Sequence, residues 1–214
     1  MSRGRGRLLV IAAPSGAGKT TLVRGLIERD PRFVFSVSYT TRPKRPNERD
    51  GVDYHFITRD AFAQLRDAGE FLEHANVFDN YYATGKAAVE ALLAAGRHVV
   101  VEIDWQGAQQ VRARMPGCRS IFIVPPSVGA LEARLRKRST DSEAVIQRRL
   151  RDSLADLSHW REFDYIVIND DLETALAELI GLASGKLRRN RVGTARVERL
   201  MTNILEHDGG TGQR

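Results

Sequence analysis

The ten residues from Ala12 to Thr21, "AAPSGAGKTT", follow the apolar run "LLVI" and decide how this chain folds. They nearly spell G-x-x-x-x-G-K-[ST], a loop whose backbone N–H groups converge on phosphate oxygens at the start of a helix. Ala13 stands where the first glycine of that pattern belongs. Because alanine tolerates only ordinary negative φ angles, we predict that position 13 stays strand-like and that the special backbone geometry begins at Ser15 or later.

The residue types of this loop suit a nucleotide triphosphate. Small residues let the main chain approach phosphate oxygens, the lysine reaches the outer phosphates, and the threonine hydroxyl can ligate Mg²⁺. The following "TTLVRGLIERD" reads as a helix. The alternative is a glycine-rich turn that holds no phosphate. The predicted nucleotide-binding residues of the loop are Pro14, Ser15, Gly16, Ala17, Gly18, Lys19, Thr20 and Thr21.

Short apolar runs recur along the chain, with helix-like stretches between them. The runs are nearly continuous rather than alternating, which is typical of strands buried on both faces of a parallel sheet. Helical periodicity follows the first, third and fourth runs, from about Lys19, Gly107 and Ser127. The pattern predicts an α/β layered fold with crossover helices. The five runs are "RLLVIAA", "FVFSVSY", "RHVVVEID", "RSIFIVP" and "DYIVIND".

Two segments interrupt this rhythm. The segment 38–85 is polar, rich in aromatic residues and full of turn residues, whereas 129–157 is strongly cationic and helical. We interpret both as subdomains inserted into the sheet core, and we expect the glycine-rich end of the chain to fray. The predicted boundaries are 1–37, 86–128 and 158–207 for the core, 38–85 and 129–157 for the two insertions, and 208–214 for a flexible tail.

The composition of the chain narrows the class of protein. Its 214 residues suffice for one substantial core, and its apolar runs fall far short of the roughly 20 residues of a membrane-spanning helix. The N-terminus does not resemble a secretory signal, so we expect a cytoplasmic protein. The single cysteine, Cys118, is expected to be a structural thiol. The formal net charge of +6 at pH 7 suits nucleic acid and polyanionic substrates equally well.

The stretch "TTRPKRP" contains two arginines spaced by prolines. Pro43 and Pro46 exclude a regular helix and favour extended or polyproline-II backbone before them. Arg42 and Arg45 then project from one side, where two guanidiniums repel each other unless an anion lies between them. The segment therefore indicates a second phosphate site, and a solvated basic loop is the alternative.

Seven motifs follow one another between roughly residues 7 and 180: "APSGAGKT", "SVSYTTRPKRPNERDGVDYHF", "EFLEHANVFDNYYATG", "EIDWQGAQQV", "IFIVPPS", "DSEAVIQRRL" and "DYIVINDD". This ordered set resembles the guanylate kinases of the nucleoside monophosphate kinase family. The resemblance implies a three-layer, parallel-sheet P-loop kinase core with an inserted GMP-binding subdomain and a helical lid. It also implies transfer of the γ-phosphoryl group of ATP to GMP or dGMP, with Mg²⁺ as the cofactor.

The resemblance also assigns the residues that bind GMP. Guanine offers two hydrogen-bond donors, N1–H and the exocyclic amine, to a carboxylate that accepts from both, whereas adenine lacks this pattern. Taken singly, Glu73 could equally be a surface charge, Thr84 a helix N-cap and Tyr82 a core aromatic residue. By resemblance, the GMP phosphate is held by Arg42, Arg45, Tyr54 and Tyr82, and guanine is read by Ser38, Glu73, Thr84 and Asp104.

Two acids of "VVVEID" are expected beside the phosphate loop. Glu102 and Asp104 are two residues apart on a predicted strand, so we expect them to face the same side. Near the carboxyl end of a parallel strand, an acid suits a direct or water-mediated contact with magnesium. The predicted metal ligands are therefore Thr20 and Glu102.

The cationic helices of 129–157 resemble the family's lid. Arg134 and Arg138 lie four residues apart on one predicted helix face, and Arg149 follows on the next helix. The resemblance implies that these arginines neutralise the transferring phosphate, and a solvated basic face is the alternative. It also implies that Asn169 contacts the adenine. The predicted catalytic residues are Lys19, Arg42, Arg134, Arg138 and Arg149.

The acceptor phosphate is already an anion at neutral pH, so alignment and charge neutralisation suffice and no general base is required. Two alternatives stay open: a non-catalytic guanylate-kinase-like module that binds phosphorylated peptides, and a related kinase for another phosphorylated small molecule. The intact "GKT" argues against the first, and the residues assigned to guanine argue against the second. We expect ATP and GMP as partners, no nucleic acid polymer, no membrane, and either a monomer or a homo-oligomer.

Overall fold

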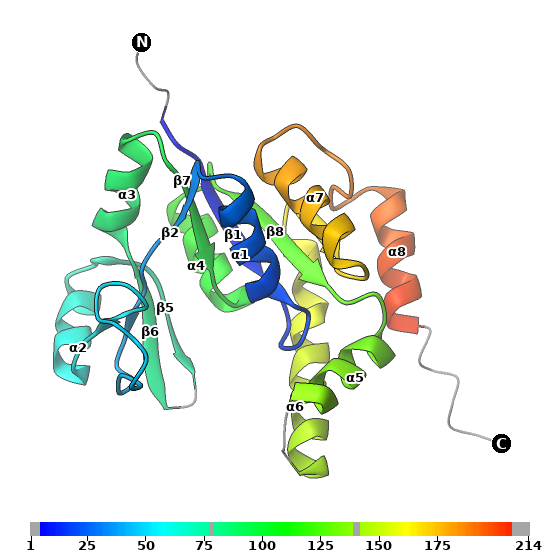
Figure 1. Ribbon diagram of the computed structural model, residues 1–214, viewed down its shortest axis with the longest axis horizontal. Helices are drawn as coiled ribbons and strands as arrows, with labels where there is room; N and C mark the ends of the chain where they lie inside the picture. Colours follow the sequence, from blue (N-terminus) through cyan, green and yellow to red (C-terminus); the bar gives the residue numbers. More distant parts are fainter. Residues whose placement is uncertain (1–4, 78, 139–141, 207–214) are drawn as a thin grey trace. The chain divides into compact units, whose positions relative to one another are not determined.

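The computed structural model describes residues 5–77, 79–138 and 142–206 (Figure 1). The chain divides into two compact units, each of which is described separately below. The first unit consists of Met1–Val10, Pro31–Val101 and Gln106–Cys118. The second unit consists of Ile11–Asp30, Glu102–Trp105 and Arg119–Arg214. Strand β1 (Leu8–Ala12) has residues in both units and is buried at all five positions.

The second unit contains the helix that follows the phosphate loop. Helices pack against the parallel pair β8 and β9, whose register runs from Ile121 opposite Tyr165 to Val124 opposite Ile168. Helix α7 is capped by Asp171, whose side chain accepts from the Thr174 backbone N–H at 2.9 Å. The elements are α1 (Lys19–Arg29), β8 (Arg119–Val124), α5 (Val128–Arg138), α6 (Glu143–Leu157), the 3₁₀ helix η1 (Ser158–Glu162), β9 (Tyr165–Ile168), α7 (Leu172–Ala183) and α8 (Ala195–Glu206).

The first unit contains a small sheet of its own, with strand order β4-β3-β6-β5. Phe62, Phe71 and Ala83 form the buried centre between helix α2 and this sheet. Strand β2 pairs in parallel with β7 in a separate sheet. The elements are β2 (Phe33–Phe35), β3 (Tyr39–Thr40), β4 (His55–Phe56), α2 (Arg59–Asp67), β5 (Phe71–Val77), β6 (Asn80–Gly85), α3 (Lys86–Ala94), β7 (His98–Glu102) and α4 (Trp105–Arg114).

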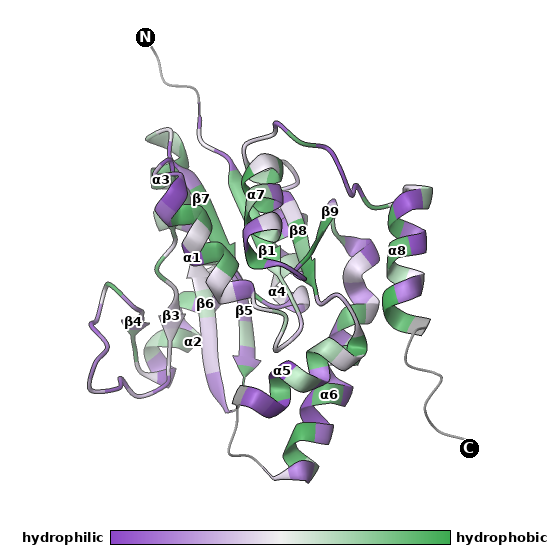
Figure 2. Cartoon of the chain, turned by 45° about the vertical axis from the view of Figure 1, so that its right-hand side comes forward, coloured by the Kyte–Doolittle hydropathy of each residue, from purple (hydrophilic) through white to green (hydrophobic). Residues whose placement is uncertain are grey.

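The five strands of the larger sheet have the order β2-β7-β1-β8-β9. Each strand arises from one of the five apolar runs, so the predicted α/β class with a parallel sheet is confirmed. Figure 2 shows β1, β7 and β8 in the hydrophobic colours, whereas α6 is banded between polar and apolar residues. This contrast is expected for strands covered on both faces and for a helix with one exposed face.

Two local predictions were wrong. The run "FVFSVSY" is not one strand, because the chain leaves β7 after Phe35 and joins the small sheet at Tyr39, with two serines in the crossing. Strand β7 ends at Glu102, so Asp104 does not lie on the strand and the argument for a shared strand face fails. Helix α4 begins at Trp105, close to the start expected near Gly107. In the described residues, no helix is both long and apolar enough to cross a bilayer.

Candidate functional site

The backbone of the phosphate loop is shaped by its glycines. Gly16 and Gly18 have φ angles of 87° and 88°, in the left-handed region that favours glycine. Among the described residues, Asp79 and Asn190 are the only non-glycine residues with positive φ, so Ala13 keeps an ordinary backbone. The predicted ordinary φ at position 13 is confirmed, although strand β1 ends one residue earlier at Ala12. The left-handed geometry begins at Gly16, and the missing first glycine leaves it intact.

Lys19 and Thr20 extend from the first turn of α1 to the segment that ends β7. The Lys19 ammonium donates to the Ile103 carbonyl at 2.7 Å, and the Thr20 hydroxyl donates to Glu102 Oε1 at 2.6 Å. The two predicted metal ligands, Thr20 and Glu102, therefore lie together. The described residues contain no group of three or more acidic, histidine or cysteine ligands. This sparse oxygen pair suits Mg²⁺, which takes few protein ligands and completes its shell with water and substrate phosphates.

Two side chains hold the loop through its backbone carbonyls. Asn169, 7% exposed just after β9, donates from Nδ2 to the Ala17 carbonyl at 2.7 Å. Ser153 of α6, 1% exposed, donates from Oγ to the Ser15 carbonyl at 3.2 Å. The Ser153 contact could not be predicted, because a lone serine in a polar helix has no distinguishing sequence pattern. The sequence-assigned contact between Asn169 and adenine stays a prediction.

The glycines of the loop also allow close packing. A Cβ at Gly18 would lie 2.3 Å from Asn169 Nδ2. A Cβ at Gly16 would lie 3.1 Å from side-chain atoms of both Leu131 and Leu135 on α5. Elements α5 and α6, predicted as the lid, thus contact the phosphate loop itself within the second unit.

The three predicted lid arginines differ in what surrounds them. Arg134 donates from Nη2 to the Asn169 carbonyl at 2.8 Å, and its buried Nη1 has no hydrogen-bond partner in the described part of the chain. Arg149 is exposed on α6. Arg138 is the last residue of α5, and its side chain lies outside the described residues. Arg134 is thus tied to the loop region through the Asn169 carbonyl.

Arg136 links the two lid helices. Its guanidinium donates to Glu132 Oε1 and to Glu143 Oε1, both at 2.7 Å from Nη2. The hydrogen bonds from Arg136 lower the pKa of Glu143 to about 2, with a contribution from Gln147. Arg136 therefore joins α5 to α6 and is not simply part of a solvated basic face.

A side-chain cluster surrounds Trp105 at the start of α4. The Trp105 and His159 rings stack with centroids 3.4 Å apart and an interplanar angle of 8°. Trp105 Nε1 donates to Asp156 Oδ1 at 3.1 Å, and His159 Nδ1 lies 2.6 Å from Glu162 Oε1. Burial raises the pKa of Asp156, and the hydrogen bond from Trp105 partly opposes that rise. His159 thus packs on Trp105 at the start of α4 and contacts Glu162.

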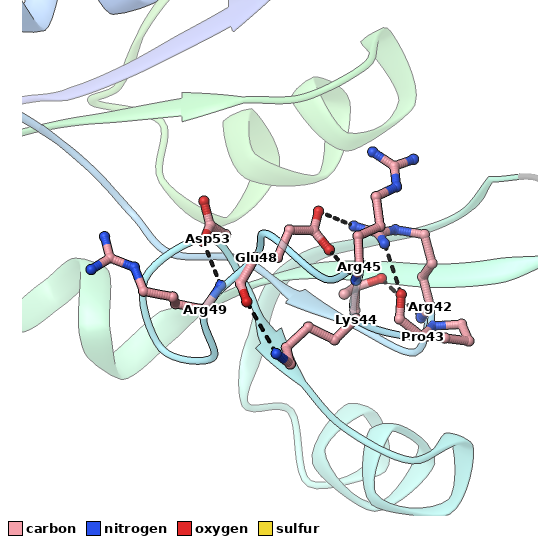
Figure 3. A network of polar contacts seen from close by, with 8 residues as sticks. Arg42, Pro43, Lys44, Arg45, Glu48, Arg49 and Asp53 are labelled. Carbon is pink, nitrogen blue, oxygen red and sulfur yellow. Dashed lines mark hydrogen bonds and ion pairs between the residues drawn. The ribbon is translucent and has the colours of Figure 1, made fainter.

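In the first unit, the carboxylate of Glu48 organises the two arginines of "TTRPKRP" (Figure 3). Arg42 Nη2 donates to Glu48 Oε1 at 2.6 Å, and the Arg45 backbone N–H donates to Glu48 Oε2 at 2.8 Å. The side chains of Arg42 and Glu48 are only 15% and 17% exposed. The hydrogen bond from Arg42 lowers the pKa of Glu48. Sequence reasoning missed Glu48, although it is the only acid in "RPKRPNER".

Two tyrosines assigned to the GMP phosphate lie with Arg42. The Arg42 guanidinium lies 5.6 Å from the centroid of the Tyr54 ring, and the Tyr54 and Tyr82 rings meet edge to face at 6.0 Å. The hydrogen bond to Glu48 raises the pKa of Arg42, and a smaller contribution comes from a hydrogen bond with Tyr82. Three of the four predicted phosphate ligands are thus brought together, while the side chain of Arg45 is exposed.

The residues assigned to guanine include one buried pair. Glu73 and Thr84 face each other across β5 and β6, are 4% and 0% exposed, and are joined by a hydrogen bond of 2.6 Å from Thr84 Oγ1 to Glu73 Oε1. The alternatives of a surface charge and a helix N-cap are therefore wrong, since the N-cap of α3 is Gly85. Ser38 is half-buried beside β3 in the same unit, and Asp104 belongs to the second unit.

Comparisons with known proteins agree with this geometry. The family model described as guanylate kinase matches residues 5–183. A guanylate kinase of Alkalilimnicola ehrlichii is 50% identical over 94% of this chain and 97% of its own length. One from Hydrogenovibrio crunogenus is 58% identical over 81% of this chain and 85% of its own. The crystal structure of guanylate kinase from Anaplasma phagocytophilum superposes with a TM-score of 0.69 at 30% identity, covering 94% of this chain and 95% of that one.

Proposed function

Since the chain belongs to the guanylate kinase family, we propose that it phosphorylates GMP with ATP through two sets of residues, one in each unit. The second unit supplies the phosphate loop for ATP, and the first unit supplies the side chains that read GMP. The observation that carries this proposal is the buried carboxylate of Glu73 with the Thr84 hydroxyl on it.

Glu73 and Thr84 suit guanine and not adenine. The Glu73 carboxylate accepts from the N1–H and exocyclic amine of guanine, and a hydroxyl at Thr84 or Ser38 donates to O6. Adenine presents an acceptor at N1, so it would leave the buried carboxylate unpaired, which is costly. Sites built around such hydrogen bonds discriminate by factors on the order of 10⁴. Because the ribose is not read by these groups, dGMP should also be accepted.

Arg42, Arg45, Tyr54 and Tyr82 are proposed to bind the GMP phosphate. Glu48 acts as a positioning residue, because its carboxylate holds both the Arg42 guanidinium and the Arg45 backbone N–H. A guanidinium that is already fixed loses less conformational freedom when phosphate binds. Glu48 therefore contributes to GMP affinity without contacting the substrate.

The ATP phosphates are proposed to lie on the backbone N–H groups from Ser15 to Thr20, with Lys19 on the outer phosphates. Mg²⁺ would be held by Thr20 and Glu102, and when bound it neutralises charge on the ATP phosphates. Arg134, Arg138 and Arg149 add positive charge from the lid helices, and Asn169 contacts the adenine. Asn169 and Ser153 also keep the loop in shape through the Ala17 and Ser15 carbonyls.

Catalysis then requires alignment and charge neutralisation. The acceptor oxygen of GMP is ionised at neutral pH, so no residue has to remove a proton. Lys19 and Arg42 fix donor and acceptor phosphates, and the lid arginines balance the charge on the transferred group. Arg134 Nη1 is a buried donor without a partner in the described residues, and it is therefore available to an acceptor on the nucleotide.

A coupled assay of ADP release with GMP, dGMP, AMP and UMP tests the proposal. We expect turnover with GMP and dGMP and far weaker turnover with AMP and UMP. Comparable rates with all four acceptors would contradict the assignment of Glu73 and Thr84. The family membership does not favour a non-catalytic phosphopeptide module, which would release no ADP with any acceptor.

A further inference from the structure

A cavity of about 370 Å³ lies in the first unit, away from the groups assigned to GMP. Its polar lining includes Arg66, His74, Lys86, Glu90 and Arg114. His74 and Glu73 are adjacent on β5, so their side chains point to opposite faces of the sheet. The cavity is therefore a different site from the one that reads guanine.

The cations of this cavity come from three separate helices. Arg66 stands near the end of α2, Lys86 opens α3, and Arg114 ends α4. A run of basic residues along one exposed helix is usually a solvated face, but three cations converging from distant segments build a concave positive surface. Only one carboxylate, that of Glu90, lines the cavity with them.

The positive charge in the cavity is only partly balanced by the described protein groups. The Lys86 ammonium has no hydrogen bond or ion pair within the described ranges. Arg66 pairs with its chain neighbour Asp67 at 2.8 Å, and Asp67 does not line the cavity. Burial lowers the pKa of His74, and Arg114 and Arg66 lower it further. Both arginines disfavour the charged imidazolium, as expected for a ring beside an excess of positive charge.

One of the three cations is held in place. Arg114 donates to the Leu72 carbonyl and, at 3.4 Å, to Gln110 Oε1. Gln110 in turn donates to the His74 carbonyl at 2.9 Å, which ties α4 to β5 beside the cavity. A charged group that is already ordered binds an anion at a lower entropic cost.

We propose that this cavity binds a small phosphate monoester through Arg66, Lys86 and Arg114. Three cations, of which Arg66 is also paired with Asp67, exceed the single carboxylate of the lining, and this excess suits a phosphate monoester, which carries close to two negative charges at neutral pH. The apolar part of the lining, made by Phe71, Leu72 and Met115, accommodates the carbon portion of the ligand. The cavity volume falls at the small end of the range of about 300–1,000 Å³ for ligand sites.

The test is the titration of His74 in the full chain, followed through its imidazole NMR resonances. ADP and GDP, neither of which is a phosphate monoester, are kept saturating without Mg²⁺, so that added anions do not report binding at the nucleotide sites. Inorganic phosphate or glycerol 3-phosphate, added at constant ionic strength, should raise the pKa of His74 by about 1, because an anion nearby favours the imidazolium. The pKa of His98, which lies outside the cavity lining, should not change.

The variant Lys86→Gln removes one cation without removing a described contact, and it should abolish most of the His74 response. Lys137→Gln on α5, which changes charge equally outside the cavity, should leave the response intact. Unchanged titration of His74 with both anions, or an equal response in wild type and Lys86→Gln, would overturn the proposal. Neither outcome bears on the proposed kinase activity, since the readout is independent of turnover.

Discussion

The phosphate loop and the Arg42–Glu48 network are both proposed to bind phosphate, but different parts of the polypeptide hold them in shape. The loop region is held through backbone carbonyls, those of Ser15, Ala17 and Ile103, which accept from three separate side chains. The network in the first unit centres instead on one side chain, the Glu48 carboxylate, which accepts from the Arg42 guanidinium and from the Arg45 backbone N–H. The loop therefore depends on backbone shape, whereas GMP recognition depends on charge and hydroxyl groups.

The substitution Gly18→Ala should have the largest effect, because it attacks backbone shape directly. The added Cβ would lie 2.3 Å from Asn169 Nδ2, at a residue with φ of 88°. We expect kcat/KM for ATP to fall by at least about 100-fold, because a small displacement of a positioning element is enough for such a loss. Steady-state kinetics with varied ATP measure this.

Gly193→Ala is the matched control, since Gly193 also has positive φ but nothing lies within 4 Å of its Cβ position. It should cost roughly 1 kcal/mol of stability and leave the KM for ATP unchanged. If kcat/KM for ATP fell equally in both variants, backbone strain rather than the shape of the loop would explain the effect.

Glu73→Gln should have the next largest effect, and it should change the kinetics with GMP rather than with ATP. The amide retains an acceptor for Thr84 but presents a donor where guanine also presents one. We expect kcat/KM for GMP to fall about 30-fold, and the preference for GMP over AMP to fall with it. The exposed Glu70→Gln serves as the control and should behave as wild type. Unaltered base preference in Glu73→Gln would refute the role of the buried pair.

Glu48→Gln tests the positioning of Arg42. We expect the KM for GMP to rise about 10-fold while kcat changes little, because the neutral amide holds the guanidinium less firmly. Since the pKa of Glu48 is lowered, its contribution is present at neutral pH and is lost as the pH falls through that lowered pKa. The difference in KM between wild type and variant should therefore shrink in acid. A change in the KM for ATP instead would place Glu48 outside the GMP site.

The smallest effect is expected from Asp156→Asn, in the side-chain cluster around Trp105 in the second unit. Burial raises the pKa of Asp156 in the folded state. The protonated carboxyl therefore stabilises the fold at a pH below its unfolded pKa, and this stabilisation is lost as the pH rises through the folded pKa. The amide keeps an acceptor for Trp105 and removes the buried charge. We expect Tm to rise by about 2 °C at pH 7, with no gain near pH 3. A fall in Tm at pH 7 would show that the charge itself is needed.

The phosphate loop and the larger sheet were predictable because their signals are local. A glycine-rich loop between a strand and a helix lies within ten residues, and continuous apolar runs mark buried strands. Ala13 departs from the glycine of the usual loop pattern, and its ordinary φ could still be predicted from the φ angles that alanine allows.

The side-chain networks were less predictable because their partners are chosen by the fold. Glu48 looked like one charge among many, and nothing in the sequence paired Trp105 with His159, 54 positions later in a different element. Glu73 and Thr84 were identified through the family resemblance, and their burial became evident only from the pairing of β5 with β6. The break in "FVFSVSY" was missed because two short strands in different sheets read as one apolar run.

Calorimetric binding of ADP and of GMP, each to Gly18→Ala and to Glu73→Gln, tests the separation of the two recognition sets most directly. The account predicts that Gly18→Ala loses ADP affinity and keeps GMP affinity, and that Glu73→Gln does the reverse. If either variant lost both nucleotides to the same extent while remaining folded, the separation of backbone recognition from side-chain recognition would be contradicted.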